Sequence, residues 1–374
     1  MSNKKAAYVA TVYAHISSFH LPFIRDLQEQ GYEVHVYASP DHCLEDVKKT
    51  GVECRDIPFS RNPLAGSNIA ALKELTKRFR EEKYHLVHVH TPNASVICRI
   101  AAWRAKLKNI VYTAHGFHFF KGASIANWLI YFPVEWMMSS LTDTLITINK
   151  EDYERAKRFP VRGSAIYMPG VGIDLSRYRS LEPVSVSELK SELGIRDDSY
   201  VILCIAELNR NKNQEQLIRS IGELKKMGVP VVGVIAGTGT MESHYQSLAR
   251  ELGLEGDIRF LGFRRDVPEL MNIADVVTLM SRREGLPKVL LEAMGVGKPM
   301  VVTSVRGNRD LVVSGHNGYV VPVDDVPETV RAFYKLYDDR EARDEMGRNS
   351  YKDASHYDLN AIRQLMTEAY ARLT

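Results

Sequence analysis

Two glutamates bracket a Gly-Leu-Pro turn in "SRREGLPKVLLEAMGVGKP", residues 281–299, where seven residues separate Glu284 from Glu292. Pro287 suits the first position of a helix, because the N–H that proline lacks would have no partner there. The free amides of such a helix start favour a phosphate. Glu292 would lie ~7 Å further along the helix, at 1.5 Å per residue.

These residue types predict a site for a nucleoside diphosphate sugar. A carboxylate is a poor ligand for a phosphate but a good acceptor for the hydroxyl groups of a sugar. The helix amides would hold the diphosphate, Glu292 the ribose and Glu284 the transferred sugar. The pattern also fits a plainer interpretation, in which the acidic turn complements the helix dipole and Glu292 lies on a solvated face.

Two strand-exit loops in the second half carry further candidate ligands. In "AELNRNKNQ", residues 206–214, Lys212 is a point charge suited to a diphosphate, with Arg210 as a second cation. The lysine could also be one charge on a solvated turn. In "IAGTGTM", residues 235–241, Gly237 allows a close approach to a ligand or simply makes a tight turn. No third glycine completes a dinucleotide fingerprint there.

Histidines mark two strand ends in the first half. His115 leaves the strand in "VYTAHGFHFF", where it either meets a ligand or packs at the strand end. His88 and His90, in "HVH", point to one side of a strand. A metal site would need further histidines and a carboxylate, and the sequence has no Asp-x-Asp pair, so we expect no metal and no cofactor. Lysine, arginine and helix amides must then meet the charge of a diphosphate.

Length and composition place limits on the kind of protein. A chain of 374 residues predicts two domains, and 45% hydrophobic with 25% charged residues is typical of a globular protein. The formal charge of +3 demands no nucleic-acid partner. Four cysteines without a C-x-x-C pair fit a reducing compartment. The apolar run "AAYVATVYA" is too short for a signal peptide or a spanning helix and predicts the first buried strand, so we expect a cytoplasmic protein.

Strand and helix patterns alternate along both halves. The expected strands of the first half are "AAYVATVYA", "YEVHVYA", "HLVHVHT", "NIVYTAH" and "DTLITIN", and those of the second are "YVILCIAEL", "VVGVIAG", "IRFLGF", "DVVTLM" and "PMVVTS". Helical patterns such as "IAALKELTKRFREEK" lie between them. The alternation predicts an α/β protein with two doubly wound, Rossmann-like domains that face each other across a cleft. We expect domains at 1–168 and 169–355, a linker near 167–178, and a C-terminal helix at 356–374 that packs back on the first domain.

The second half carries a family resemblance. "EGLPKVLLEAMGVGKPMVVT", followed by "GNRDLVVSGHNGYVV", resembles the retaining glycosyltransferases of the GT-B fold, family 4. The resemblance covers essentially the whole chain. It implies that Glu284 contacts the donor sugar, Glu292 the ribose, and His115 the sugar near its reacting carbon. One departure is Glu207, which stands where the family usually has an arginine.

The resemblance also implies the remaining donor contacts. The loop "FLGFRRD", residues 260–266, matches the base-binding loop, so that Gly262 and Phe263 read the nucleobase and Arg264 stacks on it; Phe263 could also simply fill the core. In "AHISSFH", residues 14–20, serines replace a Gly-Gly loop that many relatives place against the diphosphate. The expected catalytic residues are Glu284 and His115, and the expected donor-binding residues are Lys212, Arg210, Glu292, Gly285, Leu286, Gly237, Gly262, Phe263 and Ser17.

The expected activity is transfer of a sugar, best an N-acetylhexosamine from a UDP-sugar, to an acceptor hydroxyl. The family variant "ELNRNKNQ" is similar to bacterial enzymes that build exopolysaccharide, capsule or glycan repeats on polyprenyl diphosphate carriers. The apolar segment 122–143 would dock near the acceptor at the inner face of the cell membrane, or form a buried core helix. Two other functions fit the pattern: a nucleotide-sugar epimerase of the same fold, and a non-catalytic nucleotide-sugar binding module.

Overall fold

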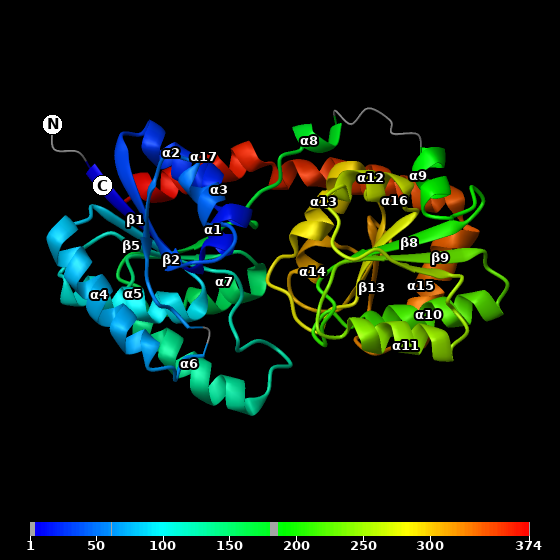
Figure 1. Cartoon of the computed structure of the whole chain (residues 1–374), viewed down its shortest axis with the longest axis horizontal. Coiled ribbons are helices and arrows are strands. Elements are labelled where there is room, and N and C mark those ends of the chain that lie inside the picture. Colours follow the sequence, from blue (N-terminus) through cyan, green and yellow to red (C-terminus); the bar gives the residue numbers. More distant parts are fainter. Residues whose placement is uncertain (1–3, 61, 180–185, 374) are drawn as a thin grey trace. The chain divides into compact units, whose positions relative to one another are not determined.

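The computed structural model describes residues 4–60, 62–179 and 186–373. These residues form two compact units. The first contains the chain up to Gly172 together with the segment from Asn360 onward, and the second is Ile173–Leu359. Each unit has one parallel sheet with helices on both faces (Figure 1). The predicted α/β class is thereby confirmed.

The sheet of the first unit has seven strands in the order β3-β2-β1-β4-β5-β6-β7, all of them parallel. Its central strands are buried on both faces because helices cover them, which explains their continuous apolar runs. The strands are β1 (Lys4–Val12), β2 (Tyr32–Ser39), β3 (Glu53–Asp56), β4 (Leu86–His90), β5 (Ile110–Ala114), β6 (Thr144–Thr147) and β7 (Ser164–Tyr167).

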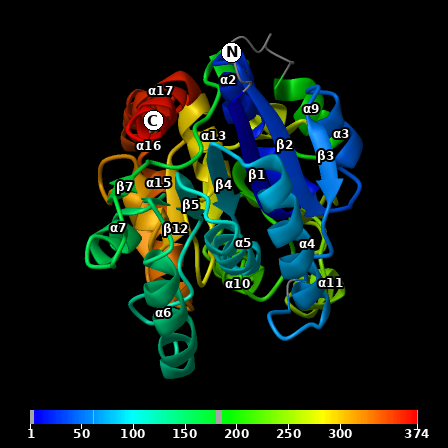
Figure 2. The same cartoon turned by 90° about the vertical axis from the view of Figure 1, so that its left-hand side faces the viewer.

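Helices cover this sheet in two layers. On one face α4 and α5 lie side by side over the central strands (Figure 2), and their apolar residues form a core with Val87 and Val89. The other face takes the C-terminal helix α17, where the Tyr370 hydroxyl lies 2.6 Å from Nδ1 of His88. The helices of this unit are α1 (Tyr13–Phe19), α2 (Leu21–Glu29), α3 (Leu44–Lys48), α4 (Ser67–Glu82), α5 (Pro92–Arg104), α6 (Ile125–Ser139), α7 (Lys150–Ala156) and α17 (Leu359–Ala371).

The sheet of the second unit has six strands in the order β10-β9-β8-β11-β12-β13, again parallel. Its strands are β8 (Tyr200–Ile205), β9 (Val231–Ala236), β10 (Ile258–Phe260), β11 (Val276–Leu279), β12 (Met300–Thr303) and β13 (Gly318–Val321). Its helices are α8 (Ser176–Arg179), α9 (Val186–Glu192), α10 (Gln214–Lys226), α11 (Glu242–Glu251), α12 (Val267–Ile273), α13 (Lys288–Val296), α14 (Asn308–Leu311), α15 (Val326–Asp338), α16 (Arg340–Asp353) and the 3-10 helix η1 (Ala354–Tyr357).

Both sheets reverse their strand order at one place, between β1 and β4 in the first and between β8 and β11 in the second. At such a switch point, the loops leaving the carboxyl ends of neighbouring strands diverge and leave a crevice where ligands bind. The loops that follow these four strands are therefore the first place to look for a site in each unit.

Two local expectations were wrong. The first strand ends at Val12, and Tyr13 and Ala14, which were expected to be strand, begin α1. Tyr13 and Ile16, three residues apart, are both buried, which is helical spacing. The segment 167–178 is also not linker throughout, since it opens with the last residue of β7 and closes in α8.

None of the described helices combines the length and the hydropathy needed to cross a lipid bilayer.

Candidate active site

The two loops at the switch point of the second sheet meet through an ion pair. Lys212, in the loop after β8, places its Nζ 2.6 Å from Oε1 of Glu284, in the loop after β11. Their side chains are only 23% and 10% exposed. Backbone contacts join the same loops, since the Arg282 amide donates to the Asn211 carbonyl over 2.7 Å. Lys212 is thus not a solvated surface charge, and the two predicted residues lie together.

The Glu284 loop is supported from behind by residues that the sequence did not single out. Nε of Arg306 donates to the Glu284 carbonyl at 3.1 Å. Gly307 has a φ of +75°, and a Cβ on it would lie 2.3 Å from the Gly285 carbonyl oxygen. Only glycine fits this position, because the loop through Gly285 and Leu286 runs directly against it. Gly307 opens the second quoted motif, so its role could have been suspected from the sequence.

Helix α13 follows this loop and begins at Lys288. Pro287 is its N-cap, with ψ at 119°, and not the first helical residue as expected. Pro287 has an extended conformation and is the last residue of the loop before the helix. Its side chain makes no capping hydrogen bond to the helix. The Leu290 amide donates to the Pro287 carbonyl over 3.1 Å, whereas the amides of Lys288 and Val289 precede the first helical hydrogen bond and are not engaged by the N-cap side chain. The helix ends at Gly297, whose φ of +75° is the left-handed conformation typical of a glycine at a helix end.

Glu292 lies within α13 and is largely enclosed, with 14% of its side chain exposed. It accepts a hydrogen bond from the Tyr178 hydroxyl, and Nζ of Lys288 lies 3.7 Å away. Burial raises the pKa of Glu292 above its ordinary value. The interpretation of Glu292 as a residue of a solvated face is therefore wrong. Tyr178 is a further residue of this site that the sequence analysis missed.

The glycines after β9 are close-approach positions for the neighbouring backbone. A Cβ on Gly237 would lie 2.0 Å from the Ala206 carbonyl oxygen, and one on Gly239 would lie 2.3 Å from that of Leu208. They let the strand exit pack against the loop that carries Lys212. The Gly237 amide also donates to the Gly262 carbonyl over 2.7 Å, which ties the expected base-binding loop to the same edge.

The expected base-binding loop is open to solvent. Phe263 is 71% exposed, so it does not fill the core. Arg264 pairs with Asp266, its Nε lying 2.7 Å from Oδ1, so stacking on a base would require it to leave that partner or to stack while paired. Arg210 and Glu207 both have exposed side chains on the Lys212 loop.

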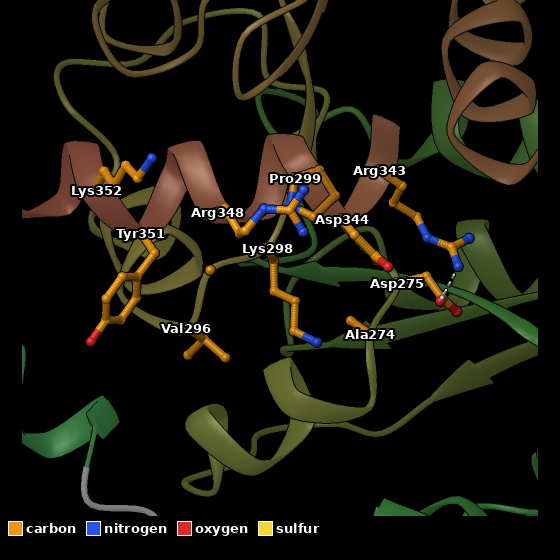
Figure 3. Close-up of a pocket in the computed structure, with 12 residues that line it drawn as sticks. Ala274, Asp275, Val296, Lys298, Pro299, Arg343, Asp344, Arg348, Tyr351 and Lys352 are labelled. Carbon is orange, nitrogen blue, oxygen red and sulfur yellow. Dashed lines mark ion pairs between the residues drawn. The ribbon is translucent and has the colours of Figure 1, made fainter. Parts of the chain in front are cut away.

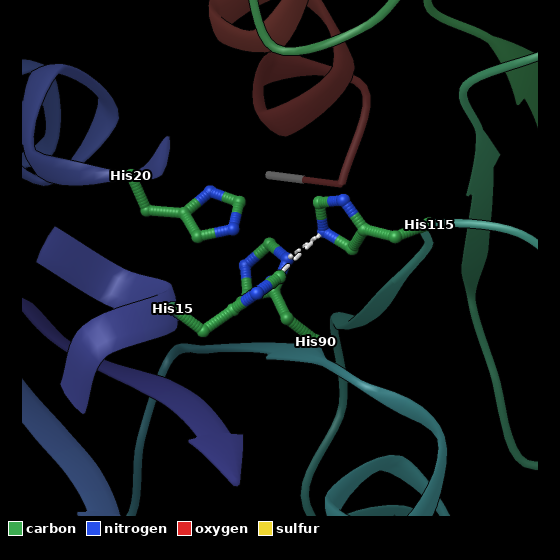
Figure 4. A group of neighbouring side chains, drawn as sticks. All are labelled: His15, His20, His90 and His115. Carbon is green, nitrogen blue, oxygen red and sulfur yellow. Dashed lines mark hydrogen bonds between the residues drawn. The ribbon is translucent and has the colours of Figure 1, made fainter. Parts of the chain in front are cut away.

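The switch point of the first sheet carries a cluster of four histidines: His15 and His20 from α1 and its end, His90 from β4, and His115 from the exit of β5 (Figure 4). Nε2 of His115 lies 3.3 Å from Nε2 of His15 and 3.3 Å from Nδ1 of His90. Burial lowers the pKa of His15 to about 4 and puts those of the other three well below their ordinary value. The imidazoles are therefore neutral at pH 7, and each can donate through one nitrogen and accept through the other.

Neutral imidazoles are also metal ligands, and one ring nitrogen from each of the four lies within 4.8 Å of the others. Among the described residues, this cluster is the largest group of side chains that could hold a transition metal. His88 does not join it through a free nitrogen, because its Nδ1 and Nε2 lie 2.6 and 2.8 Å from Tyr370 and Thr113 hydroxyls. The buried Nε2 atoms of His20 and His90 have no hydrogen-bond partner in the described structure.

Ser17, expected near the diphosphate, lies in α1 and not in a loop, and its hydroxyl hydrogen-bonds the Cys43 thiol.

A hollow of about 440 Å³ in the second unit lies elsewhere. It adjoins the carboxyl end of α13, where Lys298, Arg343 and Arg348 line it, and Arg343 pairs with Asp275 over 3.4 Å (Figure 3). Glu284 precedes the opposite end of that helix. This hollow is therefore not part of the arrangement around Lys212 and Glu284.

Comparisons with known proteins agree on one family. Residues 22–177 match "Glycosyltransferase Family 4" and residues 185–353 match "Glycosyl transferases group 1". The chain is 38% identical over 371 residues to EpsD of Bacillus subtilis, described as a glycosyltransferase, with 98% of this chain and 96% of that protein covered.

A second relative and a solved structure extend the likeness. The chain is 27% identical to the UDP-Gal:α-D-GlcNAc-diphosphoundecaprenol α-1,3-galactosyltransferase of Escherichia coli, covering 84% of this chain and 82% of that protein. The structure of Anabaena HepE in complex with UDP superposes with a TM-score of 0.81 at 22% identity, covering 99% of this chain and 100% of HepE. At that identity the likeness establishes the fold.

Proposed function

Because the chain belongs to the family 4, group 1 glycosyltransferases, which have the GT-B fold and act with retention, we propose that it extends a saccharide on a polyprenyl diphosphate carrier. It is a glycosyltransferase of polysaccharide biosynthesis. The proposed donor is a UDP-sugar, best an N-acetylhexosamine, and the proposed acceptor is a hydroxyl of the carrier-linked saccharide. The observation that carries this proposal is the Lys212–Glu284 pair beside the uncapped start of α13.

The second unit offers a separate group for the diphosphate, the ribose and the transferred sugar of a UDP-sugar. The α13 amides and Lys212 offer donors for the two phosphates. Glu292, held by Tyr178, keeps acceptor capacity for a ribose hydroxyl, and Glu284 does so for the transferred sugar. Without a donor, Lys212 and Glu284 form an ion pair. With a donor bound, Lys212 would pair with the diphosphate, and Glu284 would accept a hydrogen bond from a sugar hydroxyl.

The proposed reaction keeps the configuration of the sugar. The acceptor hydroxyl attacks the anomeric carbon on the face that the UDP leaves, and a donor phosphate oxygen takes its proton. His115 and Glu284 orient the sugar and stabilise charge, and neither forms a bond to it. Nε2 of His115 lies within hydrogen-bond distance of two neutral imidazoles, so the ring is held in place and a hydrogen bond to the sugar would be made by Nδ1.

The acceptor class is supported by the relative from Escherichia coli, whose name includes a diphosphoundecaprenol-linked sugar. The donor nucleotide is supported by HepE, which was solved with UDP and with UDP-glucose. We further propose peripheral attachment at the inner face of the cell membrane through residues 122–143.

The test is a two-step assay. UDP- and GDP-sugars are screened for thermal stabilisation, and the best donor is then incubated with carrier-linked saccharides. We expect stabilisation by UDP compounds and UDP release that requires both acceptor and enzyme. Conversion of the donor sugar without acceptor would identify an epimerase instead. Saturable binding without UDP release across the acceptor panel would identify a binding module.

We also propose that transfer needs no bound metal. After dialysis against EDTA the protein should keep most of its transfer rate, because the expected ligands of the diphosphate are lysine, arginine and backbone amides of the chain. Metal analysis of the protein before and after dialysis is the control. A stoichiometric metal whose removal stops transfer would overturn this proposal and point to the histidine cluster.

A further inference from the structure

The histidine cluster of the first unit brings ring nitrogens from separate elements to one place. His15 belongs to α1, His20 follows that helix, His90 ends β4, and His115 follows β5. One ring nitrogen of each lies within 4.8 Å of the others, and Figure 4 shows the rings turned toward one another. Sequence spacing joins only His88 and His90, so this convergence appears only once the chain is folded.

The closest nitrogens of the cluster have the spacing of ligands around one metal ion. Nε2 of His115 lies 3.3 Å from Nε2 of His15 and 3.3 Å from Nδ1 of His90. Imidazole nitrogens bind zinc at ~2.0–2.1 Å, so two of them at corners of a tetrahedron are ~3.4 Å apart. The heavy atoms of an N–H hydrogen bond are usually closer, at ~2.9–3.0 Å. The spacing therefore fits a shared ion better than a chain of hydrogen bonds.

The rings do not satisfy one another through hydrogen bonds alone. A neutral imidazole has one donor and one acceptor nitrogen. Nε2 of His115 faces two ring nitrogens at once, while the buried Nε2 atoms of His20 and His90 have no hydrogen-bond partner in the described structure. Buried polar atoms are normally paired. A metal ion that accepts a lone pair from each ring would supply a missing partner.

The surroundings of His20 suit a metal ligand. Its Nδ1 lies 3.4 Å from the hydroxyl of Tyr8, which is fully buried. If Nδ1 carries the proton and donates to this hydroxyl, the lone pair of Nε2 is left for an ion. Metal-bound histidines usually donate their second N–H to a neighbouring group in this way.

A metal ion has a path to the cluster from solvent. His15 and His115 are only partly buried, and His15 lines a hollow of about 480 Å³ together with Thr11 and Phe19. His20 and His90 are buried, so packing holds their rings in place. The site thus combines access from the surface with two ligands that are already positioned, as a binding site for a metal requires.

We propose that the histidine cluster binds one zinc ion. Imidazole suits zinc, copper, iron and nickel, and nitrogen ligands at tetrahedral spacing favour zinc. The cluster consists of imidazoles, without carboxylate or thiolate, so the ion keeps its full charge and we expect binding to be reversible. The ion would hold α1 to the ends of β4 and β5. This inference goes beyond the proposed function, because sugar transfer is expected to proceed without a metal.

Titration with Co²⁺ tests the proposal, because cobalt adopts the geometry of zinc sites and absorbs strongly in the visible range when it is tetrahedral. The chain, without a histidine tag, is stripped with EDTA, freed of the chelator and titrated with Co²⁺, and Zn²⁺ is then added. We expect a visible band that saturates at one equivalent of cobalt and disappears when zinc displaces it. Absence of this band at saturating cobalt would overturn the proposal.

Two variants locate the ion. His15→Asn and His20→Asn each remove a ligand and should weaken cobalt binding at least ~10-fold. His244→Asn, on an exposed side chain of the second unit, is the matched control and should bind cobalt as the parent does. A cooperative thermal transition in chelator shows that a variant is folded, and if His20→Asn is not, His15→Asn decides alone. Parent-like affinity in folded His15→Asn would contradict the assignment.

A rival group of ligands is tested in the same titration. Asp41, His42 and Cys43, in the loop before α3, also bring potential ligand atoms together. A thiolate ligand would add an intense charge-transfer band in the near ultraviolet, which imidazole ligands do not give. Cobalt binding that is lost in His42→Asn and kept in His15→Asn would assign the ion to this loop and overturn the proposal.

Zinc should also stabilise the folded chain, because an ion that binds only the folded state shifts the unfolding equilibrium. We expect saturating zinc to raise the melting temperature of the parent by ~3 °C or more, and that of His15→Asn by less. An equal rise in both would count against the cluster.

The outcome is separable from that of the proposed function. Zinc binding at the cluster without sugar transfer to any acceptor would leave the metal site standing and overturn the transferase proposal. Transfer by a chain that shows no cobalt band would do the reverse.

Discussion

A single contact, between Lys212 and Glu284, brings together two residues that stand 72 positions apart in the chain. Their residue types and their places after strands could be read from the sequence, and so could Glu292 within its helix. The partners of these side chains could not. Tyr178 and Arg306 reach the site through packing of the second unit, which no local pattern encodes.

Removing each charge of the pair should have different effects. Lys212→Ala should weaken UDP binding by roughly 10- to 100-fold, since hydrogen bonds to charged groups contribute about 1.5–3 kcal/mol. Glu284→Ala should abolish transfer and leave UDP binding largely intact, because the carboxylate faces the sugar in our assignment. Calorimetric titration with UDP and a transfer assay separate the two. Arg210→Ala, on the same loop, tests whether that cation contributes. Unchanged UDP affinity in Lys212→Ala would show that the diphosphate assignment is wrong.

Strands and helices with strong periodicity could be predicted, and weak ones could not. The central strands β1, β4 and β8 are apolar runs that the sequence reveals directly. The edge strands β3, β7 and β13 were missed, because "ECRD", "SAIY" and "GYVV" are only four residues long, are partly exposed and show no clear alternation. Such strands form because a neighbouring strand offers free backbone groups.

The loop between β11 and α13 depends on the glycine behind it. Gly307→Ala should displace Gly285 and lower the transfer rate at least tenfold, because its Cβ would meet the Gly285 carbonyl oxygen at 2.3 Å. Gly315→Ala is the matched control, since Gly315 has φ at +81° but nothing within 4 Å of an added Cβ. Both substitutions should cost about 1 kcal/mol of backbone strain. Equal transfer rates in the two variants would contradict a specific role for Gly307.

The histidine cluster links α1, β4 and β5 and should make the first unit sensitive to acid. Burial keeps the pKa of His15 at about 4, against 6.5 for an ordinary histidine, so the unfolded chain binds more protons between these values. Stability therefore rises with pH in this window and is lost as the pH falls below 6.5. Each such histidine contributes up to roughly 1.4 kcal/mol per pH unit.

Thermal unfolding from pH 7.5 to 4.5 measures this dependence. His20→Asn should make the melting temperature fall less steeply with acid, because one buried imidazole fewer is protonated on unfolding. His42→Asn, on an exposed side chain, controls for the loss of an imidazole. A slope that is the same in the parent and in His20→Asn would show that burial of the cluster does not set the acid sensitivity.

At the scale of the whole molecule, the family resemblance predicted more of the fold than the periodicity of the sequence did. Alternating patterns predicted two doubly wound sheets, and the described structure has them. The strand order, with its reversal in each sheet, is not written in any local pattern, because it depends on which strands pair across long stretches of chain. The motif around Glu284 supplied the fold of the family, and the strand order came only with the structure.

Packing of α17 on the first unit should contribute measurably to the free energy of unfolding. Tyr370→Phe removes a hydroxyl 2.6 Å from buried Nδ1 of His88, and should cost roughly 1–3 kcal/mol. Denaturant unfolding measures the change. Leu365→Ala, on a side chain of the same helix that is 41% exposed, should cost less. Full stability in Tyr370→Phe would mean that the helix does not support His88.

The same helix has a consequence for how the protein is made. The first unit is assembled from segments on both sides of Ile173–Leu359, which forms the second unit. During synthesis, helix α17 therefore emerges from the ribosome only after the whole second unit. Domains synthesised first usually fold first. Here the order is inverted, because the second unit can fold before the first unit receives its last helix, α17.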